Sequence, residues 1–434
     1  MTETADRPTD ATDVRAERAT CLIAGGGPAG MVLGLLLARG GVQVTVLEKH
    51  ADFLRDFRGD TVHASTIRLL DQLGLGEAFR ALPQSRLGNF RLPDRHGRSI
   101  VLGDFSTLRP PYDHVAMVPQ WDLLTLLVEA AEREPTFTLR MSTEVTDLVR
   151  DAGGRVVGVR VHDRGRDAAG ARGVILADLV VACDGRSSVL RERAGLVPRR
   201  FDVSFDTWWF RLPRTAEEQQ QVGSLEPRFA PGEAMLSFTR PTYYQVAYFA
   251  PKGDDARLRA EGVEAFRARV ARLRPDLADR VGAIGSVDDL HHLDVKVDRL
   301  RRWARPGLLC LGDAAHAMSP IGGVGINLAV QDAVAAATLL RGPLLRGDVT
   351  LDELDRVRRR RRLPTVVIQR MQLALDRTVF GPTLNGRTSP AIRLAPWVVR
   401  HLPFLRLIGP RMIAFGPRPE QAPDFARRPP VPVG

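Results

Sequence analysis

Short uncharged apolar runs, each followed by a glycine-containing turn and a helical pattern, recur along the chain. The first run is Cys21-Leu22-Ile23-Ala24, followed by GGGPAG at residues 25–30 and then by the helical stretch MVLGLLLARGG. An uncharged apolar run of this length is typical of a buried strand in a parallel sheet. A second apolar run follows at residues 42–47. This alternation of strand and helix patterns predicts an α/β fold with a parallel sheet.

The spacing of the first glycines predicts a dinucleotide site. Gly25, Gly27 and Gly30 fit G-x-G-x-x-G, in which they allow a tight turn, a close approach of backbone to a pyrophosphate, and close packing of helix on strand. Gly34, one turn further, would deepen that packing. Glu48 ends the second run, where a carboxylate accepts from ribose hydroxyls. A P-loop is excluded because no Lys-Ser/Thr pair follows the glycines.

Two later apolar runs end in similar turns. Residues 179–183 precede Asp184-Gly185 and a helical stretch from Ser188, and residues 308–311 precede Gly312-Asp313. Glycines at 322, 323 and 325 then open another helix, whose free N–H groups suit an electron-rich ligand edge. In a doubly wound sheet the carboxyl ends of neighbouring strands meet at one edge. We therefore expect one extended ligand to contact all three turns.

A second layer interrupts this rhythm. Residues 86–105 read as a hairpin, and residues 200–250 give strand after strand rich in aromatic and β-branched residues, which predicts an antiparallel sheet. Side chains two apart share a face, so Trp208, Phe210 and Leu212 form one candidate pocket wall, and Tyr244, Val246 and Tyr248 another. Either face could equally be core beneath the sheet. The candidate pocket residues are Trp208, Phe210, Phe238, Tyr244, Pro320 and Ile321.

These patterns predict a discontinuous domain arrangement. A disordered lead is expected at 1–18. The expected cofactor domain comprises 19–85, 115–195 and 295–342, the expected substrate domain comprises 86–114 and 196–294, and a helical region with a proline-rich tail covers 343–434.

Charge and cysteine content argue against a nucleic-acid-binding protein and against a metal site. The net charge is +11, but only three basic residues are lysines and no nucleic-acid motif is found, so we expect no nucleic-acid partner. Cys21, Cys183 and Cys310 lie in apolar runs without metal-ligand spacing, which indicates buried thiols in a reducing cytoplasm and no metal site. No apolar run approaches the ~20 residues of a membrane span. We expect a cytoplasmic monomer or homodimer.

Three motifs together resemble the FAD-dependent aromatic (group A) monooxygenases of the p-hydroxybenzoate hydroxylase fold. GGGPAG with Glu48 is similar to the family's ADP-binding motif. CDGRSSVLR at 183–191 is similar to its D-G-x-x-S-x-x-R motif, and LGDAAHAMSPIGGVGIN at 311–327 to its Gly-Asp motif. The resemblance implies a Rossmann-like FAD-binding domain (GR2-type), an inserted antiparallel-sheet substrate domain and a C-terminal helical region.

The resemblance also implies roles for individual residues. Arg58 would contact the pyrophosphate, Gln120 the ribityl chain and Asp313 a hydroxyl of the flavin chain, while the 320–327 backbone would hold the isoalloxazine. Asp184 and Arg191 would shape the region where FAD and nicotinamide meet. The implied cofactor-binding residues are Gly25, Gly27, Pro28, Ala29, Gly30, Glu48, Lys49, Arg58, Gln120, Asp184, Arg191, Gly312, Asp313, Pro320, Gly323, Val324, Gly325, Ile326 and Asn327.

The implied activity is hydroxylation of a phenolic or polyketide-like aromatic by a single-component enzyme. It would use bound FAD, transient NAD(P)H and O2, through a flavin hydroperoxide. The catalytic base is not identified by the pattern; His63, Arg240 and Tyr244 are candidates, with His114 and His316 also close to motifs. The alternatives are a halogenase or prenyl-lipid flavin reductase of the same fold, and a non-enzymatic protein that binds a lipid surface or a partner.

Overall fold

Parallel strands form the centre of the first sheet of the computed structural model. The structure describes residues 17–54, 60–93, 99–165, 171–220, 224–387, 389–391, 394, 397, 401 and 405–430. The parallel strands run in the order β20-β11-β1-β2-β8, so the order reverses direction at β1. A crevice for ligands forms outside the carboxyl ends of strands at such a reversal. The bounds are β1 Glu17–Ala24, β2 Val44–Leu47, β8 Phe137–Arg140, β11 Ala171–Ala182 and β20 Leu308–Cys310.

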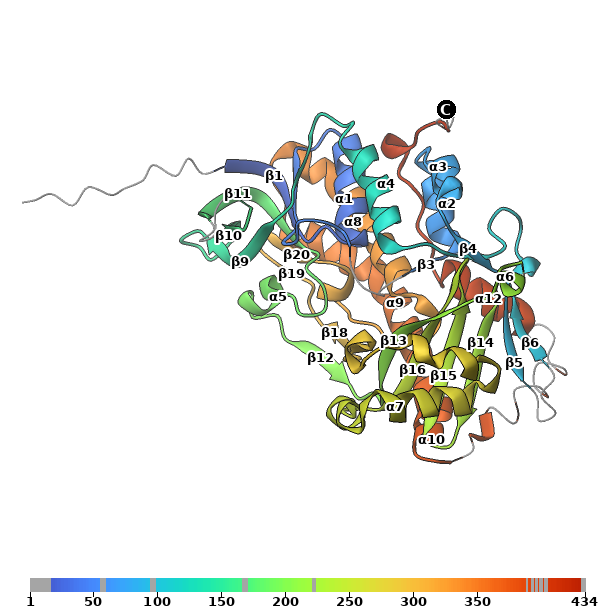
Figure 1. Cartoon of the computed structure of the whole chain (residues 1–434). Coiled ribbons are helices and arrows are strands. Elements are labelled where there is room, and N and C mark those ends of the chain that lie inside the picture. Colours follow the sequence, from blue (N-terminus) through green and yellow to red (C-terminus); the bar gives the residue numbers. More distant parts are fainter. Residues whose placement is uncertain are drawn as a thin grey trace, which may run out of the picture.

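Three helices pack with this sheet, as the sequence pattern predicts. They are α1 (Pro28–Arg39), α4 (Gln120–Ala131) and α8 (Gly325–Arg346), and α1 contacts both of the others (Figure 1). Gly34 permits the close contact of α1 with the sheet, because a Cβ there would lie 2.9 Å from the Phe137 ring and 3.0 Å from Val46. The close packing of α1 on the sheet therefore depends on the missing side chain at Gly34.

Smaller elements extend this unit. β9 and β10 form a hairpin that pairs antiparallel with β11, and β19 pairs with β20. β3, β7 and β4 make a small separate sheet, and β12 pairs with β18. The bounds are β3 Thr61–Val62, β4 Ser85–Leu87, β7 Val115–Met117, β9 Thr143–Arg150, β10 Val156–Asp163, β12 Pro198–Phe201, β18 Val297–Leu300, β19 Ala304–Arg305, α2 Ala64–Gln72, α3 Gly76–Ala81 and α5 Val189–Arg193.

The second sheet has the order β17-β13-β16-β15-β14-β5-β6 and is antiparallel except between β14 and β5. The hairpin expected at 86–105 forms β5 and β6 and joins strands from 205–293, far along the sequence, in this one sheet (Figure 1). Because these remote strands form one sheet, we propose that residues 86–114 and 196–294 form one domain, as the sequence predicts. The bounds are β5 Asn89–Pro93, β6 Ser99–Asp104, β13 Phe205–Pro213, β14 Leu225–Ala230, β15 Glu233–Thr239, β16 Tyr243–Pro251 and β17 His291–Leu293.

One face of the second sheet is covered by α7 (Asp255–Leu273). Trp208, Phe210 and Tyr248 are almost completely buried there, and the Phe210 ring lies 5.4 Å from that of Phe266 on α7. The face of the sheet that carries Trp208 and Phe210 thus forms a hydrophobic core with α7. The opposite face is left for contacts with the first unit.

The C-terminal region is helical, as expected. α9 (Leu351–Leu375) packs on α8, and α12 (Leu405–Phe415) lies against β6 and α2. Buried ion pairs connect these parts: Asp332 on α8 pairs with Arg361 on α9, and Arg361 pairs with Glu420 of the tail. The remaining helices and turns are α6 Ala216–Gln219, α10 Gly381–Leu384, η1 Phe105–Thr107, η2 Pro275–Ala283, η3 Val287–Asp289, η4 Gly312–Ala314, η5 Ile321–Gly323, η6 Asp376–Phe380 and η7 Asp424–Ala426.

Among the described helices, one is long and apolar enough to cross a membrane by length and composition alone. It spans Ile321–Arg346, and 67% of its most apolar window is buried inside the molecule. Its Ala-rich stretch, residues 333–337, is completely enclosed by neighbouring elements. This helix, which includes α8, is accordingly a core helix of the first unit.

Candidate functional site

A cavity of about 1040 Å³ lies between the first sheet and the uncovered face of the second. Its wall includes Gly27–Ala29 after β1, Cys183–Ser187 after β11, and Asp313 after β20. The three turns predicted to converge therefore line one continuous space. Its volume is at the upper end of the range for ligand pockets, which leaves room for an extended ligand and a second molecule beside it.

The glycine turn is shaped by packing at two positions and open at a third. Gly25 has φ +108°, and a Cβ there would lie 2.4 Å from the Cys183 carbonyl oxygen. A Cβ on Gly30 would lie 1.9 Å from the carbonyl oxygen of Gly25. At Gly27, which precedes α1, a Cβ would meet no atom of the described residues within 4 Å. The free N–H groups of the first turn of α1 are consequently accessible to a phosphate from the cavity.

Two carboxylates on the wall suit the hydroxyls of a dinucleotide. Oδ2 of Asp184 accepts from the Leu190 backbone N–H at 3.2 Å, whereas its buried Oδ1 has no hydrogen-bond partner among the described residues. Burial, the largest effect, raises the pKa of Asp184. Asp313 also lies on the wall, 3.7 Å from the guanidinium of Arg186. These acceptors, with the open backbone at Gly27, fit the ADP and sugar portions of FAD.

The loop at 320–326 forms the next part of the wall. Pro320, Gly323 and Gly325 border the cavity, and α8 begins at Gly325 with its N-terminus toward it. Two side chains fix this loop: Thr61 Oγ1 donates to the Gly323 carbonyl at 2.9 Å, and His63 Nε2 lies 3.0 Å from the same oxygen. Other cofactor candidates on the wall are Pro28, Ala29, Lys49, Gln120 and Ile326.

Several implied cofactor residues lie behind the wall and support it. Glu48 is 7% exposed, and its carboxylate accepts from the backbone N–H groups of Gly26 at 3.0 Å and His50 at 3.1 Å, so it holds the glycine turn. Arg191 donates to the carbonyls of Arg186 at 2.8 Å and Ala314 at 3.3 Å, which ties two of the three turns together.

Asn327 and Val324 are buried as well. Asn327 Oδ1 accepts from the hydroxyls of Ser65 and Thr66, which joins α8 to α2. Val324 packs in an apolar cluster with Ile368 of α9. Gly25, Gly30 and Gly312 shape their turns from within, and Arg58 lies outside the described residues.

The second sheet lines the cavity with one face, and three of the predicted pocket residues lie on its other face. The sequence predicts Trp208, Phe210 and Tyr244 in the pocket, but all three pack in the cluster beneath α7 and do not line the cavity. Both faces are apolar, so the period of two identifies the faces without telling which one α7 covers. Phe238, Pro320 and Ile321 do lie on the cavity wall. The sheet residues on it are Trp209, Leu225, Pro227, Phe229, Leu236, Phe238, Gln245 and Leu293.

Of the catalytic candidates, only His63 reaches the cavity. Burial lowers its pKa to about 4, so its ring is neutral near pH 7. Arg240 is buried behind the wall, with Nη2 3.6 Å from Asp60. Tyr244 belongs to the core beneath α7. His316 Nε2 is hydrogen-bonded to Asp332 Oδ2 at 2.5 Å, and His114 Nδ1 lies 3.2 Å from Asp113 Oδ1. Neither histidine lines the cavity.

Some wall residues have no local sequence signal for a ligand site. Asp60 follows the expected loop arginine by two positions, and Gln245 stands on the strand face opposite Tyr244. Period-two alternation could have found Trp209 and Gln245 if the uncovered face were known. Gly409, Pro410 and Ile413 of α12 also line the cavity, although no local pattern places this helix there.

The three cysteines are free thiols, as predicted. Cys21 and Cys310 are completely buried, and burial raises the pKa of Cys21 to about 12. Cys183 is predicted to be buried but is only half-buried on the cavity wall, and desolvation still raises its pKa strongly. Across the described ranges, no group of three or more His, Cys, Asp or Glu side chains could hold a metal ion.

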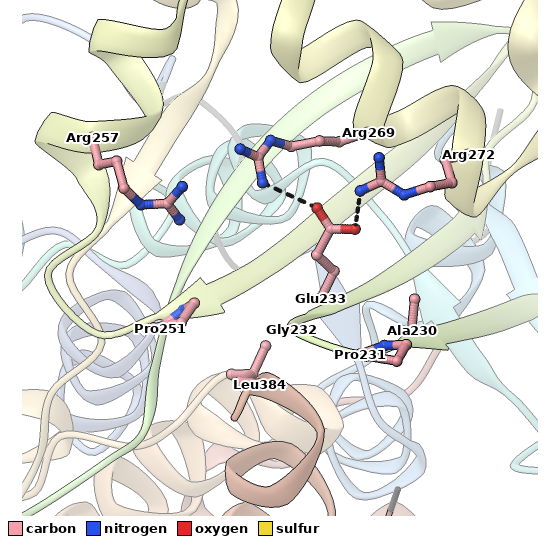
Figure 2. A pocket seen from close by; sticks show the side chains of 9 residues that line it. All are labelled: Ala230, Pro231, Gly232, Glu233, Pro251, Arg257, Arg269, Arg272 and Leu384. Carbon is pink, nitrogen blue, oxygen red and sulfur yellow. Dashed lines mark hydrogen bonds and ion pairs between the residues drawn. The ribbon is translucent and has the colours of Figure 1, made fainter. Parts of the chain in front are cut away.

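A second pocket, of about 600 Å³, opens between β15, β16 and α7 (Figure 2). Arg269 and Arg272 both point to Glu233, whose carboxylate bridges them. Arg257 pairs with Asp254 and Glu261. Because each of these guanidinium groups is already paired with a carboxylate, the arrangement stabilises α7 on the sheet and offers little unbalanced charge to a ligand.

Comparison with known proteins agrees with this geometry. A family described as FAD binding domain matches residues 18–370. The 6-methylpretetramide 4-monooxygenase of Streptomyces rimosus is 37% identical over 398 residues, which cover 91% of each chain. The solved anhydrotetracycline hydroxylase of the same organism superposes with a TM-score of 0.69 at 24% identity, over 95% of this chain and 80% of that one.

The same fold is also found in halogenases. The myxobacterial chondrochloren halogenase superposes with a TM-score of 0.71 at 18% identity, over 92% of each chain, which shows a common fold alone. The extent of the family match and the 37% identical relative are decisive for classification. The chain belongs to the FAD binding domain family. Within it, the protein is an FAD-dependent aromatic monooxygenase, an oxidoreductase that incorporates one oxygen atom.

Proposed function

We propose that the protein hydroxylates a polycyclic aromatic polyketide, with NAD(P)H as the reductant and O2 as the oxidant. The observation that carries this proposal is the continuity of the cavity, which joins the dinucleotide turns to an apolar aromatic wall. A flat ring system placed against Trp209 and Phe238 would lie next to the loop at 320–326. The 37% identical relative is named for a monooxygenation of 6-methylpretetramide, which supports this substrate class.

FAD would be held along the three turns. The first turn of α1 would bind the pyrophosphate, Asp184 and Asp313 would accept from hydroxyls, and the N-terminus of α8 would face the flavin ring. When bound, this cofactor accepts a hydride from a nicotinamide and activates molecular oxygen. The chain's own contribution is to orient the two ligands and to exclude water with its apolar wall.

NAD(P)H is proposed as a transient co-substrate. The sequence has one G-x-G-x-x-G turn in a strand–helix context, and the FAD pyrophosphate would occupy it. The nicotinamide must then approach the flavin ring without a dinucleotide fold of its own and leave before oxygen reacts. We propose that the protein does this as a monomer or homodimer, without a separate reductase.

A substrate screen tests the proposal. The FAD-loaded protein is mixed with polycyclic phenols, including 6-methylpretetramide, and with NADH or NADPH, and both nicotinamide oxidation and product mass are followed. We expect at least one tetracyclic phenol to stimulate oxidation and to gain the mass of one oxygen atom. A product that gains a halogen, or that only loses a double bond, would instead support one of the alternative activities.

A further inference from the structure

Within the part of the chain that the structure describes, two polar groups on the mostly apolar sheet face of the cavity wall have no hydrogen-bond partner. The amide oxygen of Gln245 and the indole N–H of Trp209 are both inaccessible to solvent and make no hydrogen bond among the described residues. Gln245 is only 2% exposed. A buried acceptor or donor without a partner is costly, so native structures rarely leave one unless a ligand or water completes it.

These groups stand beside each other on one sheet face. Gln245 on β16 is directly opposite Phe238 on β15, and Trp209 on β13 is opposite Ala247, two residues further along β16. The rings of Trp209 and Phe238 are stacked, with centroids 5.9 Å apart. A flat ligand lying on this aromatic pair would therefore bring its edge to both polar groups.

Asp60 and Arg240 lie next to the Gln245 amide and bear on its orientation. Oδ2 of Asp60 lies 3.6 Å from Nη2 of Arg240, and the two side chains are 10% and 3% exposed, respectively. Burial, the largest effect, raises the pKa of Asp60, but the positive charge of Arg240 and a hydrogen bond from the Gln245 side chain oppose this. An ionised Asp60 can only accept in that hydrogen bond, so the donor would be the Gln245 NH2 group. Its enclosed oxygen is thereby left without a hydrogen-bond donor among the described residues.

We propose that Gln245 determines substrate specificity: its amide oxygen accepts a hydrogen bond from a phenolic or enolic hydroxyl, and the Trp209 N–H donates to an adjacent carbonyl. The preferred substrate would present a hydroxyl next to a carbonyl on a fused aromatic edge. This inference rests on the proposed function, since it assumes that the aromatic substrate occupies this part of the cavity. Asp60 and Arg240 act as positioning residues through Gln245.

The test uses two probes that differ in the hydroxyls alone. They are 1,8-dihydroxyanthracen-9-one, which has hydroxyls next to its carbonyl, and anthracen-9-one, which lacks them. Dissociation constants for FAD-loaded wild type and Gln245→Leu are measured from the change in flavin absorbance. A buried hydrogen bond of this kind corresponds to a preference of about five- to tenfold. We expect the wild type to bind the hydroxylated probe at least about fivefold more tightly, and the variant to lose that preference.

Ser237→Ala is the matched control. Ser237 is also 2% exposed, carries an unpartnered hydroxyl within the described chain, and belongs to the same sheet, but it pairs with Val246 and faces α7. This variant should retain the wild-type preference. If Gln245→Leu fails to retain FAD, the unbranched Gln245→Met is measured in its place.

Either of two results would overturn the inference: no preference for the hydroxylated probe in the wild type, or a preference that survives removal of the amide. Failure of the proposed function is separately visible, because it appears as a lack of substrate-stimulated NAD(P)H oxidation by the wild type. A wild type that hydroxylates polycyclic phenols while Gln245→Leu keeps the preference would refute the role of Gln245 alone.

Discussion

Gly27 and Gly30 are three residues apart in one turn, yet their missing side chains serve different purposes. A Cβ at Gly30 would lie 1.9 Å from a backbone oxygen, whereas one at Gly27 would enter open space on the cavity wall. Gly27 has an extended backbone, with φ −75° and ψ −177°, which any residue can adopt. Packing therefore requires glycine at position 30, whereas we propose that glycine at position 27 leaves space for a bound ligand.

This difference predicts opposite phenotypes for two similar substitutions. Gly30→Ala should destabilise the protein by on the order of 3 kcal/mol, because the backbone must move to relieve the contact. Gly27→Ala should change the unfolding free energy of the FAD-free protein by less than about 1 kcal/mol. It should nevertheless weaken FAD binding at least about tenfold, since the methyl group would occupy the space that the pyrophosphate needs.

Urea unfolding of the apoprotein and titration with FAD measure the two effects separately. If Gly27→Ala binds FAD as tightly as the wild type, the pyrophosphate does not lie at this turn. Replacement of the cofactor by FMN in the purified wild type would likewise contradict the assignment, because FMN lacks the ADP half that the turn would hold.

The residues of this turn could be predicted from sequence because their constraint is local. A positive φ at Gly25 and a close approach at Gly30 are satisfied by one residue type, so the spacing reveals both. Asp60 and Gln245 had no such signal. Their importance comes from side chains that the fold brings together across 180 and more residues, which no local pattern contains.

At the scale of one element, the two faces of the second sheet have separate tasks. Phe210 is 1% exposed and packs beneath α7, whereas Phe238 is half-buried on the cavity wall. The sequence predicted the sheet and its aromatic content correctly. It misassigned the face at Trp208, Phe210 and Tyr244, because α7, which covers that face, is placed by tertiary packing.

Two phenylalanine truncations should separate these tasks. Phe210→Ala removes a core ring and should lower the unfolding free energy by about 3–5 kcal/mol, with little change in substrate KM for the folded enzyme. Phe238→Ala should cost clearly less stability and raise KM, because it removes half of the aromatic pair with Trp209. Denaturation curves and steady-state kinetics with the same substrate check both; equal KM values for the two variants would contradict the assignment of the faces.

Buried charges join α8 and α9 to the C-terminal tail. Asp332 accepts from His316 at 2.5 Å and from Arg361 at 2.9 Å, and Arg361 in turn lies 3.3 Å from Glu420. Asp332 and Arg361 are completely buried. Removing one member of such a network leaves its partners unpaired in a low-dielectric interior, which is far more costly than losing an exposed pair.

Asp332→Asn should therefore lower the unfolding free energy by about 3–5 kcal/mol. Asp352→Asn at the exposed start of α9 is the control, and its loss should stay below about 1 kcal/mol. Burial raises the pKa of Asp332, but His316 and Arg361 more than offset this and hold it below 3.8. Its ionised form thus stabilises the fold above that pH, and the contribution disappears as the pH falls through the lowered pKa.

Urea unfolding between pH 7 and pH 3 tests this sign. The wild type should lose more stability over the acidic part of the range than Asp332→Asn, in which the titrating group is absent. A steeper acid dependence in the variant would show that Asp332 is not the group responsible.

At the scale of the whole molecule, the cavity is completed by segments that are remote in sequence. The three turns of the first unit, the uncovered face of the second sheet and α12 all border it. The convergence of the turns follows from parallel strand order, so motif order alone predicted it. The sequence did not predict that α12 closes the cavity with Gly409, Pro410 and Ile413, because the pattern of an amphipathic helix does not specify the surface on which it packs.

This arrangement gives the last prediction, which concerns the reaction as a whole. We propose that one cavity holds both flavin and substrate and that the one G-x-G-x-x-G turn holds FAD, so a single polypeptide should oxidise NAD(P)H slowly alone and faster once an aromatic substrate is bound. Under ¹⁸O₂ the product should gain one labelled oxygen atom, and under H₂¹⁸O none. The apolar wall supports this outcome, because exclusion of water favours transfer of activated oxygen to the substrate over its release as hydrogen peroxide. A product labelled from water, or a requirement for a second protein to deliver hydride, would contradict single-component monooxygenation; a halogenated product would assign the chain to the other chemistry of this fold.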